Sequence, residues 1–321
     1  MKGLYPPIKP RAKGYFQVSD GYRLYYELVG KANGIPVVFL HGGPGAGFRK
    51  NDKRFFNPKN FNVLLFDQRG AGKSKPFAST VNNTTQKLIE DIQALTSHFF
   101  GYRKVLVFGG SWGSTLALTY SLAYPERILG MLIRGVFLAD REDNADYFGG
   151  GTRAQYPDVW ERFISNVPRS RRNNWRTIIA FYESKFRIKK TTVRHKFCRE
   201  WCRFETSMLK LKYDPKQVEK VSREKATLAL APLEAHYIGR LGFMPDNYLI
   251  DNVHKLSGIP TTIVHGRHDN ICRPINAWRV HKAIKGSKLV FVNSAHSAHD
   301  ENMEPRLREE MDLLGKKLRR A

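Results

Sequence analysis

The sequence predicts an α/β protein with a mostly parallel central sheet, helices on both faces and an inserted helical unit. Apolar runs with the length of buried strands alternate with helical patterns over the first 138 residues, and two more such runs follow residue 240. Between them, residues 139–240 are rich in Arg, Lys, Trp and Phe and contain no buried-strand run. We therefore expect a core of residues 1–138 and 241–321, interrupted by a helical cap of residues 139–240.

The strands are indicated by their composition and by the turns around them. The chain opens with two expected strands around a Ser-Asp-Gly turn, GYFQV (14–18) and RLYYELV (23–29). Continuous apolar runs then predict strands buried on both faces, at 36–40, 62–66, 104–108 and 130–138. The last two expected strands are TTIVH (261–265) and KLVFV (288–292).

Helices are expected between these strands. Apolar residues recur at helical spacing over 84–100, with Thr84 as a plausible N-cap. A second helix is expected at STLALTYSLAY (114–124), which Pro125 ends. A charged helix is expected from about Glu304.

The composition limits the class of protein. The chain of 321 residues is 41% hydrophobic and 12% aromatic, which is typical of a globular protein. No apolar run approaches the roughly 20 residues that span a bilayer, and the N-terminal stretch lacks the apolar segment of a signal peptide. The chain has three cysteines, Cys198, Cys202 and Cys272, and this low, odd number argues against a disulfide framework. We therefore expect a cytoplasmic protein.

The formal net charge of +25 raises the question of a polyanionic partner. The basic residues are spread along most of the chain, without a block comparable to a tail, and no spacing typical of a helix-turn-helix, an RRM or a zinc finger accompanies them. We therefore expect no specific nucleic-acid partner and no membrane partner. The sequence gives no indication of the oligomeric state.

The stretch VLVFGGSWGSTLAL (105–118) places Ser111 in a G-x-S-x-G pattern between an expected strand and an expected helix. Small neighbours permit the sharp turn that exposes a serine hydroxyl, and the N-terminus of the following helix favours developing negative charge. By chance alone such a pattern is common, so its meaning depends on the rest of the chain.

A serine nucleophile needs a base and a group that orients the base. In an α/β hydrolase these follow in the order Ser, Asp or Glu, His. Asp269 comes just after the strand TTIVH, and His296 just after the strand KLVFV. Since the carboxyl ends of parallel strands meet at one edge of the sheet, we expect Ser111, Asp269 and His296 to form a catalytic triad.

The oxyanion of such a reaction needs two donors. The backbone N–H of Trp112, directly after the nucleophile, is one candidate. The glycine-rich loop HGGPG (41–45) follows an early strand, and the backbone N–H of Gly43 is the other.

Two further motifs have structural interpretations. DQRGAGKS lacks the first glycine of a phosphate-binding loop, so Asp67 and Arg69 are expected to be structural, and Cys198 and Cys202 are expected to pack in a core.

Several segments together resemble a known peptidase family. LYPPIKP, PVVFLHGGPG, FDQRGAGKS, GGSWGSTLALTYSLAYPERI, LIRGVFL, HGRHD and AHSA are similar to those of prolyl aminopeptidases, also called proline iminopeptidases. These are serine peptidases of the α/β-hydrolase fold that release N-terminal proline from peptides. The resemblance implies the same triad, peptide substrates with N-terminal proline, no metal and no cofactor.

The resemblance also implies a site for the substrate amine. Family members bind this amine with two glutamates of the cap, which correspond to Glu205 in CREWCRFETSML and Glu234 in PLEAHY. The secondary ammonium of an N-terminal proline has two N–H donors, which two carboxylates can accept. The alternative is that each glutamate only pairs with Arg203 or Arg240. The proline ring is expected to rest on apolar side chains, with Phe137 and the Trp112 ring as candidates.

Some residues depart from the family pattern. Ala295 stands where a glycine usually precedes the histidine, Phe204 replaces the usual tryptophan before the first glutamate, and His299 offers a second possible base. These departures leave a second interpretation open, which is another α/β hydrolase, either an esterase or an aminopeptidase of different specificity.

Overall fold

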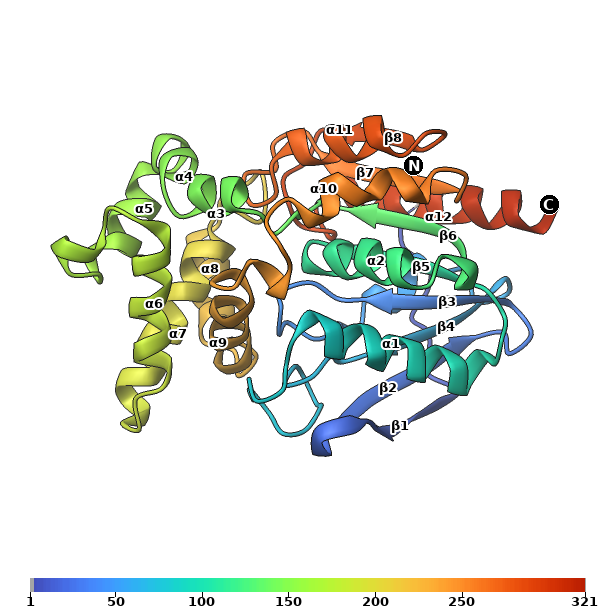
Figure 1. The fold of residues 1–321 in the computed structure, drawn as a ribbon, viewed down its shortest axis with the longest axis horizontal. Helices are drawn as coiled ribbons and strands as arrows, with labels where there is room; N and C mark the ends of the chain where they lie inside the picture. Colours follow the sequence, from blue (N-terminus) through green and yellow to red (C-terminus); the bar gives the residue numbers. More distant parts are fainter. Residues whose placement is uncertain (1–2, 321) are drawn as a thin grey trace.

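The protein, described here by a computed structural model for residues 3–320, is built on one eight-stranded sheet (Figure 1). The strand order is β1-β2-β4-β3-β5-β6-β7-β8. The six neighbouring strands from β4 to β8 in this order are parallel to one another, whereas β2 is antiparallel to both β1 and β4. The strands are β1 (Ala12–Gln17), β2 (Arg23–Gly30), β3 (Ile35–Leu40), β4 (Phe61–Phe66), β5 (Val105–Gly110), β6 (Ile128–Arg134), β7 (Thr261–Gly266) and β8 (Lys288–Val292).

The helices fall into a core set and a cap set. The core helices are α1 (Thr85–Phe100), α2 (Trp112–Ala123), α10 (Tyr248–Asn252), α11 (Pro274–Ala283) and α12 (Met303–Arg320). The cap helices are α3 (Arg141–Tyr147), α4 (Gly150–Gln155), α5 (Pro157–Ser165), α6 (Trp175–Phe186), α7 (Thr191–Thr206), α8 (Pro215–Ser222) and α9 (Thr227–Ile238). Among residues 3–320, every helix is too short or too polar to span a lipid bilayer.

Two apolar layers hold the sheet between its helices. One layer joins the sheet to α1, α2, α10 and α11, and the other joins the opposite face to α12 and the short 3-10 helix η2 (Asp52–Phe55). Every residue of β4, β5 and β7 is buried, as the continuous apolar runs predicted. The prediction of an α/β core with a mostly parallel sheet is confirmed.

The segment between β6 and β7 contains no strand and forms most of its own core. Helices α3–α9 enclose an aromatic cluster that includes Phe148, Phe163, Tyr182, Trp201 and Phe204. The Phe163 and Phe204 rings stack with centroids 4.1 Å apart. Figure 1 shows these helices gathered at one end of the sheet. On this ground we propose residues 139–240 as the inserted cap.

The predicted strand 130–138 was wrong at its C-terminal end. β6 ends at Arg134, and Gly135 adopts φ +50°. A Cβ at Gly135 would come within 3.1 Å of the His296 ring, so the backbone turns there against a histidine. Val136 and Leu138 are still buried, because the chain continues under the cap as an irregular segment.

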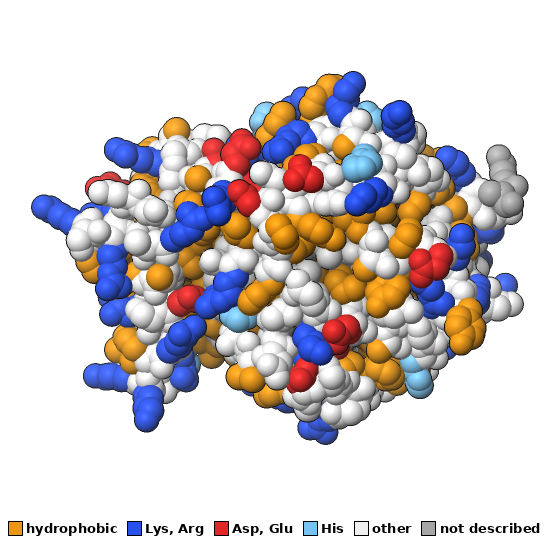
Figure 2. Space-filling view, viewed as in Figure 1, with side chains coloured by type: hydrophobic (Ala, Val, Ile, Leu, Met, Phe, Trp, Pro, Cys, Tyr) orange, Lys and Arg blue, Asp and Glu red, His pale blue; other side chains and the backbone are white. Residues whose placement is uncertain are grey.

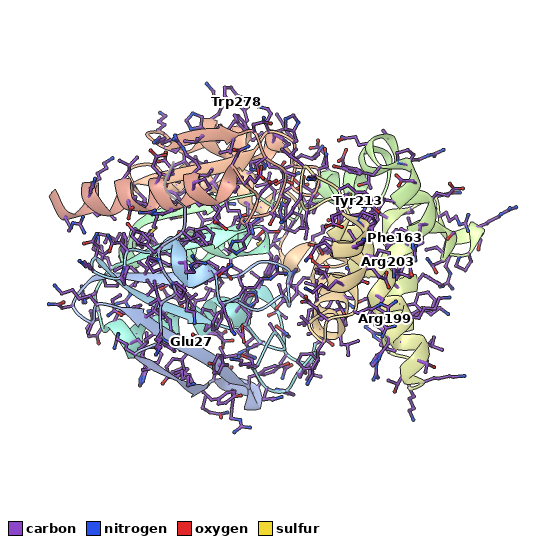
Figure 3. The ribbon with its side chains drawn as sticks, turned by 180° about the vertical axis from the view of Figure 1, so that it is seen from behind. Glu27, Phe163, Arg199, Arg203, Tyr213 and Trp278 are labelled. Atoms are coloured by element: carbon purple, nitrogen blue, oxygen red, sulfur yellow. The ribbon has the colours of Figure 1, made fainter. Side chains whose placement is uncertain are left out.

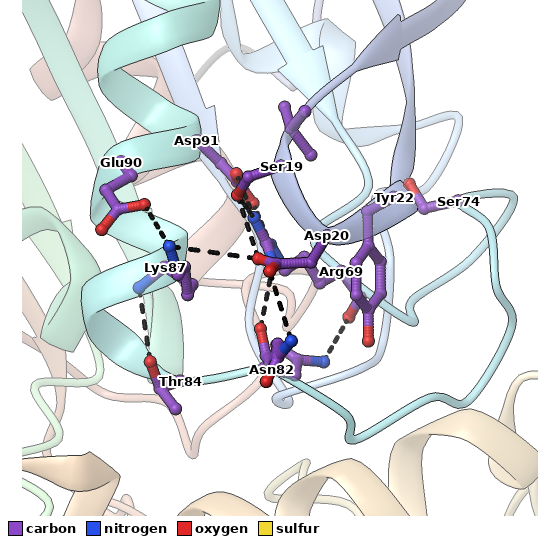
Figure 4. A network of polar contacts seen from close by, with 12 residues as sticks. Ser19, Asp20, Tyr22, Arg69, Ser74, Asn82, Thr84, Lys87, Glu90 and Asp91 are labelled. Atoms are coloured by element: carbon purple, nitrogen blue, oxygen red, sulfur yellow. Dashed lines mark hydrogen bonds and ion pairs between the residues drawn. The ribbon is translucent and has the colours of Figure 1, made fainter.

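The motif DQRGAGKS builds a structural network, as expected (Figure 4). The fully buried Arg69 guanidinium donates to both carboxylate oxygens of Asp91, at 2.7 and 2.9 Å, and to Asp20 at 2.8 Å. Asp67 accepts backbone N–H bonds from Phe48 and Lys73, and burial raises the pKa of its carboxyl to about 6. The network joins α1 to the loop after β4.

Replacing Arg69 should destabilise the fold strongly. In Arg69→Met, the Asp91 carboxylate stays buried without its cation, and the loss of unfolding free energy at neutral pH should be about 3–5 kcal/mol. Lys87→Met is the matched control, since Lys87 pairs with Glu90 and Asp20 at the surface of the same network, and its loss should be far smaller. Urea unfolding measures both, and equal losses would contradict the structural role of Arg69.

Candidate active site

Ser111 lies at the turn between β5 and α2, in a backbone conformation that is rare for a residue with a side chain. Its φ is 57° and its ψ is −128°, and it caps the N-terminus of α2. Only 8% of its surface is exposed. A strained serine at the carboxyl end of a central parallel strand, on a sharp turn beside a cavity, is typical of a nucleophile.

The glycines of the motif are required by close packing. A Cβ at Gly109 would lie 2.1 Å from the Gly113 carbonyl oxygen, and a Cβ at Gly113 would lie 2.0 Å from that of Leu40. Both contacts are far below van der Waals distance, so any larger residue would push the turn away from β3. The spacing of G-x-S-x-G therefore has a steric cause in this chain.

His296 and Asp269 form a buried pair beside the turn. The His296 Nδ1 atom lies 2.8 Å from Asp269 Oδ2, while Asp269 Oδ1 accepts the backbone N–H groups of Ile271 and Cys272 at 3.0 and 2.9 Å. Burial alone would raise the pKa of Asp269, but the charge and hydrogen bond of His296 outweigh it and hold that pKa below its usual value. The ionised carboxylate favours the tautomer with the proton on Nδ1, which leaves Nε2 as a proton acceptor.

The hydrogen bond between the serine and the histidine of a triad is not formed in the described structure. Among residues 3–320, no hydrogen bond joins Ser111 Oγ to His296, although both residues line one cavity. The Nε2 atom instead lies 3.4 Å from an Arg134 nitrogen, which also donates to the His296 carbonyl oxygen at 2.9 Å. In free enzymes this bond is often long and shortens when substrate binds.

His299 is engaged elsewhere. Its Nε2 lies 3.0 Å from Asp52 and its Nδ1 lies 3.0 Å from Glu304, and its ring stacks on Phe55. Burial would lower the pKa of His299, but its bonds to the two carboxylates prevail and raise it. Since both ring nitrogens have carboxylate partners, the geometry favours His296 over His299 as the base.

The glycine loop after β3 lies against the serine. A Cβ at Gly42 would lie 3.1 Å from Ser111 Cβ, and Gly43 lines the same cavity as Ser111. Trp112 is the first residue of α2, and the first N–H groups of a helix have no acceptor within it. The arrangement thus suits both expected oxyanion donors, Gly43 and Trp112.

The Trp112 side chain does not face the cavity, which corrects one expectation. The ring is fully buried against Tyr237, 4.6 Å away, and its Nε1–H donates to Gln68 at 3.1 Å. The helix points this ring into the core, so it cannot contact a substrate ring. Phe137, the other candidate, does line the cavity.

Two chambers meet at the serine. A smaller chamber lies under the cap and is lined by Phe137, Asn144, Tyr147, Glu234, Ile238 and Cys272. A larger one extends past His296 and Arg134 toward Arg49 and Leu230. Gly43, Ser111 and Glu205 line both chambers, so the reacting atoms of a bound substrate would sit at their junction.

The structure brings Glu205 and Glu234 together in the smaller chamber. Glu234, on α9, is 4% exposed and accepts the Trp201 Nε1–H at 2.6 Å. Glu205, at the end of α7, has one buried carboxylate oxygen without a hydrogen-bond partner in the described chain. Burial and then the nearby Glu205 carboxylate raise the pKa of Glu234 well above its usual value. The pair lacks a cation.

The neighbouring arginines do not supply that cation. Arg203, a residue of α7 (Figure 3), pairs with Glu200 and Glu219, and Arg240 pairs with Glu183 at 2.8 Å. The alternative in which Arg203 and Arg240 neutralise the two glutamates is therefore wrong. A buried carboxylate beside a second carboxylate, with no cation for either, is costly and is typical of a binding site for a positive group.

Sequence reasoning did not identify Trp201, Tyr147 or Cys272 as parts of this site. Trp201 orients Glu234, while Tyr147 and Cys272 form part of the wall, and burial raises the pKa of both the Tyr147 hydroxyl and the Cys272 thiol. Trp201 stands four residues before Glu205, one helical turn away, which was the only available signal. Tyr147 had none, because its position depends on how the cap folds back.

The other two cysteines lie in the core of the cap. Cys198 and Cys202 are buried in the aromatic cluster of the cap. Within residues 3–320, no group of three His, Cys, Asp or Glu side chains is arranged to hold a metal ion.

Comparison with known proteins gives the family. A family model described as alpha/beta hydrolase fold matches residues 35–303. The chain is 41% identical over 306 residues to the proline iminopeptidase of Arabidopsis thaliana, covering 95% of this chain and 80% of that one. It is 39% identical to a probable proline iminopeptidase of Leptolyngbya boryana, covering 92% and 91%.

A solved structure supports the fold. The crystal structure of proline iminopeptidase from Mycobacterium smegmatis superposes with a TM-score of 0.65 at 18% identity, over 96% of this chain and 98% of that one. The family model and the sequence relatives show that the chain belongs to the proline iminopeptidase family of α/β hydrolases.

Proposed function

We propose that the chain is a serine aminopeptidase that releases N-terminal proline from peptides. The observation that carries this proposal is the pair of buried Glu234 and half-buried Glu205, which has no cation among residues 3–320 and shares a chamber with Ser111. An N-terminal amine placed between the two carboxylates would bring its own carbonyl carbon next to the serine. The names of the relatives point to the same substrate.

The reaction follows from the roles of the three catalytic groups. Ser111 Oγ attacks the carbonyl carbon while His296 Nε2 takes its proton, and Asp269 stabilises the imidazolium. The oxyanion accepts the N–H groups of Gly43 and Trp112. The C–N bond then breaks as His296 returns the proton to the leaving amine, and water hydrolyses the acyl-enzyme by the same steps.

The two chambers divide the substrate between them. The proline ring would lie in the smaller chamber, against Phe137 and Tyr147, with its ammonium on the glutamates. The leaving peptide would extend into the larger chamber, on the side of His296 that must protonate it. A small, enclosed acyl chamber suits a compact residue and fits an exopeptidase, since the glutamates bind the terminal amine.

The second candidate is an esterase or an aminopeptidase with another preference, which the same triad could support. An esterase needs no carboxylate pair, so the two glutamates favour the aminopeptidase.

A cytoplasmic location stays part of the proposal, because the chain has a low count of cysteines.

A substrate panel tests the proposal. We expect hydrolysis of proline arylamide to exceed that of alanine and leucine arylamides, and Ser111→Ala to abolish it, because Ser111 is the only described residue with a hydroxyl or thiol that lines both chambers. Folded protein that cleaves an acyl ester well and proline arylamide not at all would support the esterase instead.

The glutamates should act on the amine alone. Glu205→Gln and Glu234→Gln should each lower kcat/KM for proline arylamide by about tenfold to a hundredfold, because each removes one charge-assisted hydrogen bond of roughly 1.5–3 kcal/mol. Hydrolysis of an ester that has no amine should change little. Glu224→Gln, an exposed glutamate of the same cap, is the matched control and should behave like the native chain.

The pH profile should report Glu234. A protonated Glu234 cannot neutralise the ammonium, so kcat/KM for proline arylamide should rise with pH as the raised pKa of Glu234 is passed. Trp201→Phe removes a hydrogen bond that lowers this pKa, so the rise should move to higher pH. A profile that is identical in Trp201→Phe would contradict the role of Glu234.

The contribution of Glu234 to the stability of the fold should fall as pH rises, whereas its contribution to kcat/KM should rise. Because the folded pKa of Glu234 exceeds the unfolded one, its favourable contribution is complete below pH 4.5 and is lost as pH rises. A glutamine stays neutral, so Glu234→Gln should raise Tm by about 2–4 °C near pH ~8 and by much less near pH ~4.5. Thermal unfolding of both proteins at the two pH values measures this. If Glu234→Gln had a lower Tm than the native chain at the higher pH, the idea that the ionised Glu234 carboxylate destabilises the fold would be contradicted.

A further inference from the structure

We propose that the outer hairpin of the cap, residues 169–199, binds the phosphate backbone of nucleic acid without preference for base sequence. This hairpin includes the 3-10 turn η4 (Arg169–Arg171), helix α6, the loop after it and the first half of α7. It is distinct from both chambers of the candidate active site, because none of its residues lines them.

The hairpin concentrates positive charge far above the average of the chain. Residues 169–199 contain eleven Lys or Arg and one acidic residue, Glu183. The excess of ten positive charges in 31 residues is two fifths of the net charge of +25, carried by a tenth of the chain. Although basic residues occur along most of the chain, they are therefore densest in this part of the cap, which the sequence itself shows to be rich in Arg and Lys.

These charges have almost no acidic partners in the fold, although Arg172 donates to two backbone carbonyl oxygens. Within residues 3–320, only Arg187 of the eleven has an ion pair, at 3.8 Å from Glu183, and Glu183 already bonds Arg240 at 2.8 Å. Most of the others are exposed to solvent: Arg169, Arg171, Arg176, Lys189, Lys190, Lys196 and Arg199. Repulsion among unpaired like charges opposes folding, and a bound polyanion would relieve it.

The shape of the segment suits an extended anion. Figure 2 shows Lys and Arg side chains gathered along the outer edge of the cap, with few acidic side chains among them. In Figure 1, α6 forms this edge, while α9 lies on the side nearer the sheet. Helix α6, which lies wholly within the hairpin, has 12 residues and so extends about 18 Å, which matches the spacing of several successive phosphates.

The surface fits nucleic acid better than a membrane or a protein. Helices that lie on membranes insert exposed Trp, Phe or Leu side chains. The large apolar residues that are well exposed in the described chain all lie outside 169–199, and Trp175 is buried. Protein interfaces are depleted of charge at their centres, whereas backbone binding of nucleic acid depends on unpaired Lys and Arg. The segment has no base-reading module, which agrees with the expectation of no specific nucleic-acid partner.

The test compares two charge variants of the full chain. The hairpin variant carries Lys189→Gln, Lys190→Gln, Lys196→Gln and Arg199→Gln. The control variant carries Lys13→Gln, Lys31→Gln, Lys285→Gln and Arg153→Gln, which are exposed and lie outside the hairpin. Both lose four positive charges, so net charge cannot distinguish them. Fluorescence anisotropy is measured at several salt concentrations with a labelled 20-base-pair DNA duplex, a single-stranded RNA, and phosphatidylserine–phosphatidylcholine vesicles.

We expect the native chain and the control variant to bind duplex or RNA with a steep salt dependence. In the hairpin variant, affinity should fall by about tenfold or more, and the slope of log Kd against log salt should become shallower by roughly 2–4. Arylamide hydrolysis should be equal in all three proteins, which also verifies folding. Equal losses in the two variants, no binding by the native chain near physiological salt, or stronger binding to vesicles than to nucleic acid would each overturn the proposal.

Discussion

Two neighbouring carboxyl groups, Glu234 buried and Glu205 half-buried, have no cation beside them among residues 3–320, and this constraint organises the molecule. Glu205 comes from the C-terminal end of α7 and Glu234 from α9, and burial together with the nearby Glu205 carboxylate raises the pKa of Glu234. Such a pair opposes folding, and the aromatic cluster of the cap must hold it in place. A positively charged amine removes both costs at once, which couples substrate binding to the electrostatics of the cap.

The core and the cap contribute different parts of the chemistry. The core sets the reacting groups through backbone geometry: the strained Ser111, the glycines on either side of it and the turn at Gly135 that leaves room for His296. The cap supplies the chamber and its charge. Its inner side carries two unpaired carboxylates, whereas its outer hairpin carries unpaired cations, so opposite charges are kept on opposite sides of one helical unit.

The sequence predicted the parts that depend on local pattern. Apolar runs located the strands, and G-x-S-x-G, Asp269 and His296 were found because each follows a strand of the same sheet. It failed where long-range packing decides. The extension of β6 past Arg134 and the inward turn of the Trp112 ring could not be read from apolar character alone. Tyr147 and the Trp201–Glu234 bond depend on the folding of the cap, which has no local signature.

Binding of a terminal amine by the carboxylate pair can be measured without catalysis. Isothermal titration of the inactive Ser111→Ala chain with a short proline peptide, in two buffers of different ionisation enthalpy, gives both affinity and proton exchange. The account predicts binding with release of a proton from Glu234, and at least tenfold weaker binding of the same peptide with an acetylated N-terminus. Equal affinity for the free and acetylated peptides, with no proton released, would contradict it.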